Sequence, residues 1–308
     1  MSKIIVTHKS PDLDAITSVW LLKRFLPEWS SAKFDFVPAG QKLSGHYKKE
    51  GDVVEVIGSN EIIHVDTGLG ALDHHQFQDE TICAASVVLE YVRSQPDNIL
   101  DKDDFTPAAL EKIIDLVIDE DHFQQVFYAD NASYLREFTF VGILDGLKLQ
   151  QSMYDDKILE MGMLCLDALV LSFVSRVEAE EELENKGKKF TTKWGDAIAF
   201  ETVNDTVMKI AQIKGYAVVV RQDPSNHLLR IKAQPRMRKD KKYNGDGQKE
   251  RDIDLTPVYE IVKEKDPYAS WFLHASKRML LNGSSKNPNT IPTKFSIDEV
   301  IEILQSVK

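Results

Sequence analysis

Residues 7–16, Thr-His-Lys-Ser-Pro-Asp-Leu-Asp-Ala-Ile, stand where a predicted strand turns into a predicted helix. A short apolar run at residues 4–6 precedes them, and apolar residues recur at helical spacing from Ile16 to Phe25. Pro11 suits the first turn of a helix and restricts the residue before it to extended conformations. Ligands of open α/β sheets bind at the carboxyl ends of the strands. The polar residues of this turn are therefore candidates for a functional site.

His8, Asp12 and Asp14 offer one imidazole and two carboxylates within this turn. Such a set suits a hard or borderline divalent ion, such as Mn²⁺ or Mg²⁺, better than an ion that prefers thiolates. A second interpretation is that the two carboxylates only cap the N-terminus of the helix, where negative charge is favourable. Taken alone, the pattern leaves both interpretations open.

Residues 62–76, Ile-Ile-His-Val-Asp-Thr-Gly-Leu-Gly-Ala-Leu-Asp-His-His-Gln, favour the metal interpretation. They form a second apolar strand that ends in an acid, a loop with two glycines and an Asp-His-His triplet. With this triplet the chain resembles the DHH phosphoesterase superfamily, which includes RecJ-type exonucleases, oligoribonucleases and family II inorganic pyrophosphatases. The motifs that carry the resemblance are His8-x3-Asp12-x-Asp14, Asp66 and Asp73-His74-His75.

The fourth motif of the superfamily is a further acid, which we seek in residues 117–123, Val-Ile-Asp-Glu-Asp-His-Phe. Asp119 is the first choice because its spacing to Phe123 resembles the D-T-G-x-F form, and Asp121 is the second choice. Within the superfamily, the D-H-H-Q spelling at 73–76 and the segments 230–235 and 271–276 resemble the MYG group, whose members resemble 3′–5′ RNA exonucleases.

The resemblance implies two divalent ions, Mn²⁺ or alternatively Mg²⁺, bridged by Asp66. It assigns His8 and Asp12 to one ion. It assigns Asp14, His74 and Asp119 to the other ion. His75 would contact the scissile phosphate, and Asp73 would orient a ligand. We assign no role to His64 and His122, which we interpret as structural histidines.

The order of predicted elements indicates an α/β protein with three regions. Residues 1–146 would form the DHH catalytic domain, with a mostly parallel sheet covered by helices. Residues 147–190 would form a long helical connector, and 191–308 a smaller α/β substrate-binding domain. The predicted strands are 4–6, 33–37, 53–56, 62–65, 197–201, 217–221, 228–233 and 270–273; the predicted helices are 12–25, 84–93, 107–118, 257–263 and 297–304.

The C-terminal region carries a candidate substrate site around the loop Asn-Gly-Ser-Ser at 282–285. Backbone N–H groups and hydroxyls of such a loop can bind a phosphate, and nearby cations add charge-assisted hydrogen bonds. The alternative is a surface turn with scattered basic residues. The candidate residues are His274, Lys277, Arg278, Ser284 and Lys286.

Composition limits the classes of function. The 308 residues are 43% hydrophobic and 28% charged, as in ordinary globular proteins, and the net charge of −11 argues against a generally basic surface for nucleic acid. A local basic groove stays compatible with this charge. The two cysteines form no C-x-x-C pattern, which disfavours a zinc ribbon. Without a signal-peptide pattern or an apolar run of membrane-spanning length, we expect a cytoplasmic protein without a membrane partner.

Our leading hypothesis is a metal-dependent phosphodiesterase or 3′–5′ exonuclease that acts on short oligonucleotides or single-stranded ends. One alternative is a small-molecule phosphatase or pyrophosphatase, which fits the acidic charge better. Another is a non-catalytic protein that binds a phosphate compound. The sequence is also compatible with a homo-oligomer.

Overall fold

The computed structural model describes residues 1–100, 107–128, 134–150, 153–237, 251–283, 287 and 289–308. Over these residues the protein is α/β, with eight α-helices and two mixed sheets. The chain divides into two compact units, Met1–Val174 and Ser175–Lys308. The boundary lies inside the segment that the sequence predicts as a helical connector.

The sheet of the first unit has the strand order β2-β1-β5-β4-β3. Its strands are β1 (Ser2–His8), β2 (Lys33–Val37), β3 (Tyr47–Lys49), β4 (Glu55–Ile57) and β5 (Asn60–His64). β1 pairs in parallel with β2 and β5, whereas β4 is antiparallel to both of its neighbours. The prediction of a mostly parallel sheet is therefore wrong. A two-residue turn that begins at Gly58, with a φ of 60°, folds β4 and β5 into a hairpin.

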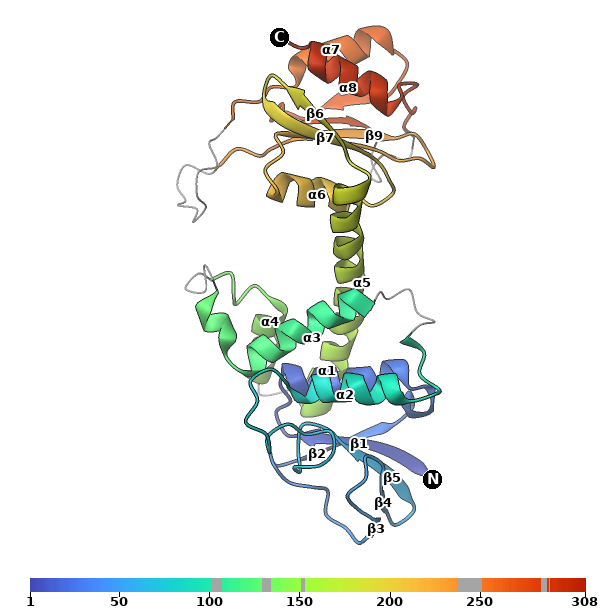
Figure 1. Ribbon diagram of the computed structural model, residues 1–308, viewed down its shortest axis with the longest axis vertical. Helices are drawn as coiled ribbons and strands as arrows, with labels where there is room; N and C mark the ends of the chain where they lie inside the picture. Colours follow the sequence, from blue (N-terminus) through green and yellow to red (C-terminus); the bar gives the residue numbers. More distant parts are fainter. Residues whose placement is uncertain (101–106, 129–133, 151–152, 238–250, 284–286, 288) are drawn as a thin grey trace. The chain divides into compact units, whose positions relative to one another are not determined.

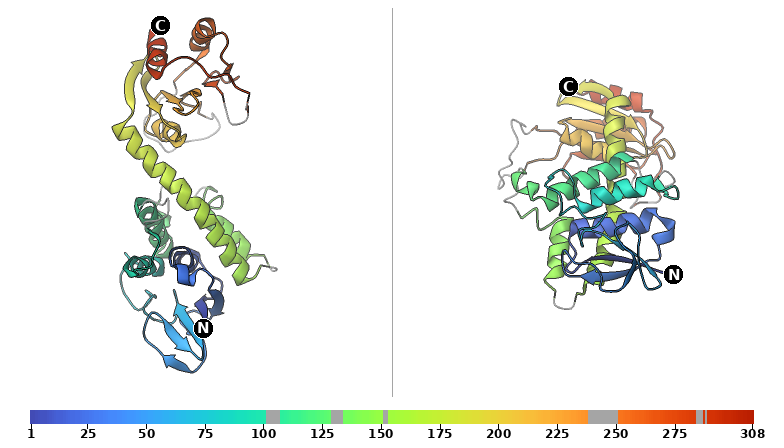
Figure 2. Two further views of the ribbon diagram at one scale, coloured as in Figure 1. Left: turned by 90° about the vertical axis from the view of Figure 1, so that its right-hand side faces the viewer. Right: turned by 60° about the horizontal axis from the view of Figure 1, so that its bottom comes forward.

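Helices cover one face of this sheet. Because successive strand residues point to opposite faces, Ile5 packs with the helix residues Ile16 and Trp20, whereas Val6 packs with Val37 on the other face. Helices α1 and α2 lie on the covered side, and α3 packs on α1 (Figures 1 and 2). The helices are α1 (Leu13–Phe25), α2 (Ala84–Ser94), α3 (Pro107–Asp121), α4 (Phe140–Lys148) and the first part of α5 (Asp155–Asn185), with 3₁₀-helices at Pro27–Trp29 and Gln124–Phe127.

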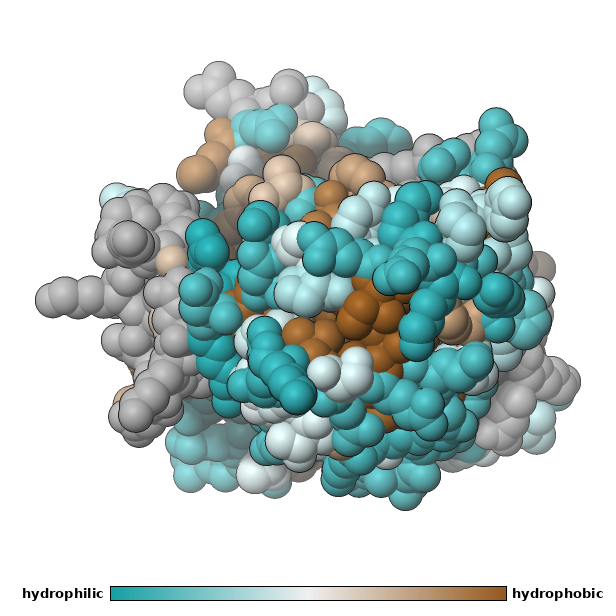
Figure 3. All heavy atoms as spheres, turned by 90° about the horizontal axis from the view of Figure 1, so that it is seen from above, coloured by the Kyte–Doolittle hydropathy of each residue, from teal (hydrophilic) through white to brown (hydrophobic). Residues whose placement is uncertain are grey.

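The second unit has a six-stranded sheet in the order β10-β11-β9-β8-β7-β6, in which only the β7–β8 pairing is parallel. Its strands are β6 (Lys188–Thr192), β7 (Gly195–Glu201), β8 (Val218–Gln222), β9 (Leu229–Ala233), β10 (Trp271–Leu273) and β11 (Met279–Asn282). Helix α6 (Thr206–Ile213) packs on one face, and α7 (Thr256–Lys265) and α8 (Ile297–Ser306) pack on the other (Figure 1). Figure 3 shows the end with α7 and α8, where hydrophilic side chains surround a small apolar area.

Helix α5 is long and apolar enough to cross a membrane by length and composition alone, although we expected no apolar run of that length. Core helices of soluble proteins meet the same criterion, so the observation is weak evidence. Ile158, Leu159 and Leu166 of α5 are buried in the core of the first unit, which accounts for part of its apolar character.

Candidate metal centre

The end of β1 and the turn that follows it carry the first two candidate ligands, His8 and Asp12. Asp12 caps α1, because its Oδ1 accepts a hydrogen bond of 3.0 Å from the backbone N–H of Ala15. Its second oxygen, Oδ2, lies 3.5 Å from Nε2 of His8. Helix capping leaves Oδ2 of Asp12 open to a cation, so the two interpretations of the turn do not exclude one another.

A backbone contact fixes the ring orientation of His8. Its Nδ1 lies 2.9 Å from the carbonyl oxygen of Lys9, and because a carbonyl only accepts, Nδ1 must carry a proton. Nε2 then points at the cluster, 3.1 Å from Oδ2 of Asp66. Burial lowers the pKa of His8, but the carboxylates of Asp12 and Asp66 outweigh it and raise the pKa to about 11. A cation at Nε2 therefore competes with a proton.

Asp66 lies at the centre of the cluster and follows β5. Its φ of 53° is uncommon for a residue other than glycine, and its backbone N–H donates to the carbonyl of Leu72. Its Oδ1 lies 3.7 Å from Nε2 of His74 and 3.7 Å from Nδ1 of His75. Burial raises the pKa of Asp66 to about 7. The unusual backbone thus points a buried carboxylate at three histidines.

Two atoms of the cluster have no hydrogen-bond partner among the described residues. They are Oδ1 of Asp66 and Nε2 of His74, and both are buried. Nε2 of His74 lies 3.5 Å from Asp121, 3.6 Å from Asp14 and 3.7 Å from Asp66, which is too far for good hydrogen bonds. Buried polar atoms without partners are costly, and a bound cation would satisfy both of them.

Asp14 joins a second helix to the cluster. Its Oδ2 accepts a 2.7 Å hydrogen bond from the backbone N–H of Ala84, and its Oδ1 accepts one of 2.7 Å from Ala85. The carboxylate therefore satisfies the N-terminus of α2, although we expected it to cap α1 if it capped a helix. Burial and the neighbouring charge of Asp66 raise the pKa of Asp14 well above its ordinary value.

Asp73 and His75 form a hydrogen-bonded pair at the edge of the cluster. Asp73 is buried and accepts from Nδ1 of His75 at 2.7 Å and from the backbone N–H of Leu69 at 2.7 Å. Burial opposes ionisation of Asp73, but these hydrogen bonds outweigh it and lower the pKa of the carboxyl. The ring of His75 is 56% exposed, so its other nitrogen, Nε2, is available to a bound molecule.

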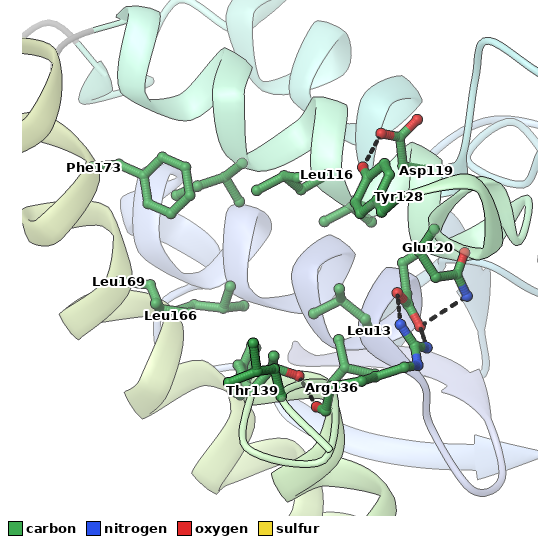
Figure 4. A pocket seen from close by; sticks show the side chains of 16 residues that line it. Leu13, Leu116, Asp119, Glu120, Tyr128, Arg136, Thr139, Leu166, Leu169 and Phe173 are labelled. Carbon is green, nitrogen blue, oxygen red and sulfur yellow. Dashed lines mark hydrogen bonds and ion pairs between the residues drawn. The ribbon is translucent and has the colours of Figure 1, made fainter. Parts of the chain in front are cut away.

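The structure separates the two acids considered for the fourth motif. Oδ2 of Asp121 lies 3.5 Å from Nε2 of His74, whereas Asp119 accepts a hydrogen bond from the hydroxyl of Tyr128 and lines a different pocket (Figure 4). Residues two apart on a helix point in nearly opposite directions, and α3 extends to Asp121. Asp119 is therefore replaced by Asp121 as the candidate ligand.

His122, to which the sequence gives no role, lies beside the cluster. Its Nε2 is 2.8 Å from the carbonyl of Ile82, to which it must donate, and 3.7 Å from Oδ2 of Asp121. In the sequence, its position directly after the candidate ligand Asp121 could have indicated a role in the site. By contrast, His64 lies in a separate buried network, where Nδ1 contacts Glu55 at 2.7 Å and Nε2 accepts from the backbone N–H of Leu43.

Three groups of described side chains are close enough to hold a metal ion. Asp66 belongs to two of the groups and His74 to two, so the groups form one continuous centre. Their donors are imidazole nitrogens and carboxylate oxygens, which are common ligands of divalent metal ions in proteins. The groups are His8-Asp12-Asp66, Asp66-His74-His75 and His74-Asp121-His122.

The predicted substrate residues of the second unit do not form one described cluster. Arg278 is buried, and its guanidinium donates to the backbone carbonyls of Gln234 and Arg251 at 2.6 Å each. Lys277 pairs with Asp254 at 2.9 Å. The exposed ring of His274 contacts the hydroxyl of Ser276. The remaining two candidates, Ser284 and Lys286, lie outside the described residues.

Comparison of the chain with models of protein families and with curated proteins finds no match in either. The relationship to the DHH phosphoesterases stays a prediction from the quoted motifs.

Proposed function

We propose that the protein is a divalent-metal-dependent phosphoester hydrolase. The observation that supports this most is the pair of buried, unpartnered atoms, Oδ1 of Asp66 and Nε2 of His74, among converging carboxylates. A cation bound between them would give both atoms a partner. Here their geometry fits a cation, and the predicted motifs supply the same residues.

The proposed ligands divide into two sets that share Asp66. His8 and Asp12 form the first set, and Asp14, His74 and Asp121 form the second. When bound, two divalent ions would supply a water nucleophile at neutral pH and would stabilise the entering and leaving oxygens of a displacement at phosphorus. The protein holds these side chains with hydrogen bonds to the Lys9 carbonyl and to the N-terminus of α2.

His75 is the proposed contact to substrate. Asp73 fixes Nδ1 of the ring and leaves the exposed Nε2 to face a phosphate oxygen. Asp73 is thus a positioning residue, and His75 is the residue proposed to touch the substrate.

We propose phosphodiesters of short oligonucleotides as the substrate class, on the resemblance of the motifs to exonucleases. A direct test is a panel of short RNA, short DNA, cyclic dinucleotides, pyrophosphate and an aryl phosphodiester, each with Mn²⁺ and with Mg²⁺. Turnover of the diesters, but not of pyrophosphate, would support the proposal. Turnover of pyrophosphate alone would favour a small-molecule phosphatase, and inertness on all of them would favour a binding protein.

A matched pair of variants on α3 tests the site itself. Asp121→Asn should reduce the turnover by more than about 10–100-fold, the loss typical for residues that only support a metal ligand. Asp115→Asn is the control, because Asp115 is exposed on the same helix and pairs only with Lys112 among the described residues. Equal turnover by the two variants would refute the assignment of Asp121.

A further inference from the structure

A cavity of about 470 Å³ lies in the first unit between α1, α3, α4 and the first part of α5. Small-molecule sites typically enclose about 300–1,000 Å³. Ten of its sixteen lining side chains are aliphatic or phenylalanine, and none of the sixteen belongs to the three metal-binding groups. The cavity is therefore large enough for a small molecule and distinct from the metal centre.

The apolar end of the cavity is built by α5. Leu166, Leu169 and Phe173 follow one another at intervals of three and four residues, so they lie on one face of the helix. Figure 4 shows them on one side of the cavity, with Leu13 and Leu116 between them and the carboxylates of Asp119 and Glu120. An apolar molecule at this end would bury its surface against these side chains.

The polar end carries a net negative charge. Glu120 and Arg136 form an ion pair, so their charges cancel. Asp119 accepts a hydrogen bond from Tyr128, and this bond, together with burial, raises the pKa of the tyrosine to about 12, which keeps it protonated. Within the described part of the chain, no ion pair joins Asp119 to a lysine or arginine. The carboxylate of Asp119 is thus the uncompensated charge of the cavity.

We propose that this cavity binds a small organic cation, an amine with an aryl or alkyl body. The body would lie against Leu166, Leu169 and Phe173, and the ammonium group would donate to Asp119. Charge complementarity selects a cation over an anion, and the separation of apolar and polar ends fixes the orientation. A hydrogen bond with an ionised donor or acceptor is about twice as strong as a neutral one, and here both groups are charged, so the head group should dominate selectivity.

The cavity also borders the elements that hold the metal centre. Leu13 lies between Asp12 and Asp14, and Glu120 directly precedes Asp121. A bound amine would therefore pack on the first residue of α1 and the last turn of α3, without contacting a proposed ligand. The proposal does not depend on hydrolase activity, because amine binding can be measured by itself.

The test uses three probes with one body: 4-phenylbutylamine, 4-phenylbutan-1-ol and 4-phenylbutyrate. Their binding to the full-length chain is measured by calorimetry, with and without Mg²⁺. We expect saturable binding of the amine that is about tenfold or more tighter than that of the alcohol, since only the ammonium adds the attraction of opposite charges to the hydrogen bond with Asp119. The acid should bind most weakly. No saturable binding, or a preference for the acid, would overturn the proposal.

Three variants locate the site. Leu169→Trp fills the apolar end and should abolish amine binding, whereas Leu171→Trp, at a 57% exposed position of the same helix that does not line the cavity, should leave it unchanged. Asp119→Asn should remove the preference for amine over alcohol without any change to the core. Binding that survives Leu169→Trp, or a head-group preference that survives Asp119→Asn, would place the amine elsewhere.

Discussion

Replacement of Asp66 by asparagine should stabilise the metal-free protein at pH 8. Burial raises the pKa of this carboxyl from 3.8 to about 7, so the folded state binds more protons than the unfolded state between these values. The parent protein therefore loses stability as the pH rises through this window, and asparagine does not titrate. By linkage, the free energy of unfolding of the variant, relative to that of the parent, should rise by about 2 kcal/mol between pH 5.5 and pH 8.

The assay is urea unfolding in the presence of EDTA at the two pH values. Asp97→Asn is the control, because Asp97 is exposed and lies outside the metal-binding groups. Saturating Mn²⁺ should make the parent more stable than the variant. An ion that binds only the folded state stabilises that state, and the variant lacks the carboxylate proposed to be shared by both ions. If the stability difference between variant and parent did not grow with pH, the raised pKa of Asp66 would be refuted. If Mn²⁺ stabilised parent and variant equally, the role of Asp66 as a metal ligand would be refuted.

Three further outcomes are expected. Asp121→Asn should slow metal-dependent hydrolysis more than Asp119→Asn does, and the reverse order in turnover assays would restore Asp119 as the ligand. Asp14→Ala should lower the free energy of unfolding by about 1–3 kcal/mol, because buried N–H groups of α2 lose their acceptors; unchanged urea midpoints would contradict this. Metal binding should release protons, and the affinity for the metal should increase from pH 6 to pH 8, because His8 must lose a proton to bind the ion. Calorimetry in buffers of different ionisation enthalpy measures the proton release, and the absence of any release would exclude His8 as a ligand.

Local patterns predicted the elements that carry the first motifs. The strand predicted at 33–37 coincides with β2, and the helix predicted at 12–25 differs from α1 by one residue. These segments have apolar residues at the spacing of buried strands and helices, so burial and sequence agree. β6 escaped detection because it is an edge strand, Lys-Lys-Phe-Thr-Thr, in which one apolar residue gives little periodicity.

The arrangement of the site depends on contacts that local patterns do not contain. The sequence placed Asp14 in the first turn of α1, but its partners, Ala84 and Ala85, lie about seventy residues away. The predicted end of the third helix at residue 118 left the directions of Asp119 and Asp121 open. In the structure α3 extends to Asp121, so both acids lie on the helix and their side chains point in nearly opposite directions.

The most direct test of the central claim is to count bound Mn²⁺ by electron paramagnetic resonance during a titration of the full-length chain. The proposed centre predicts two ions per chain with magnetic coupling between them, because Asp66 is shared by both ligand sets. Asp66→Asn should remove the coupling. A parent protein that binds no Mn²⁺, or binds it only as isolated ions that Asp66→Asn leaves unchanged, would contradict the account.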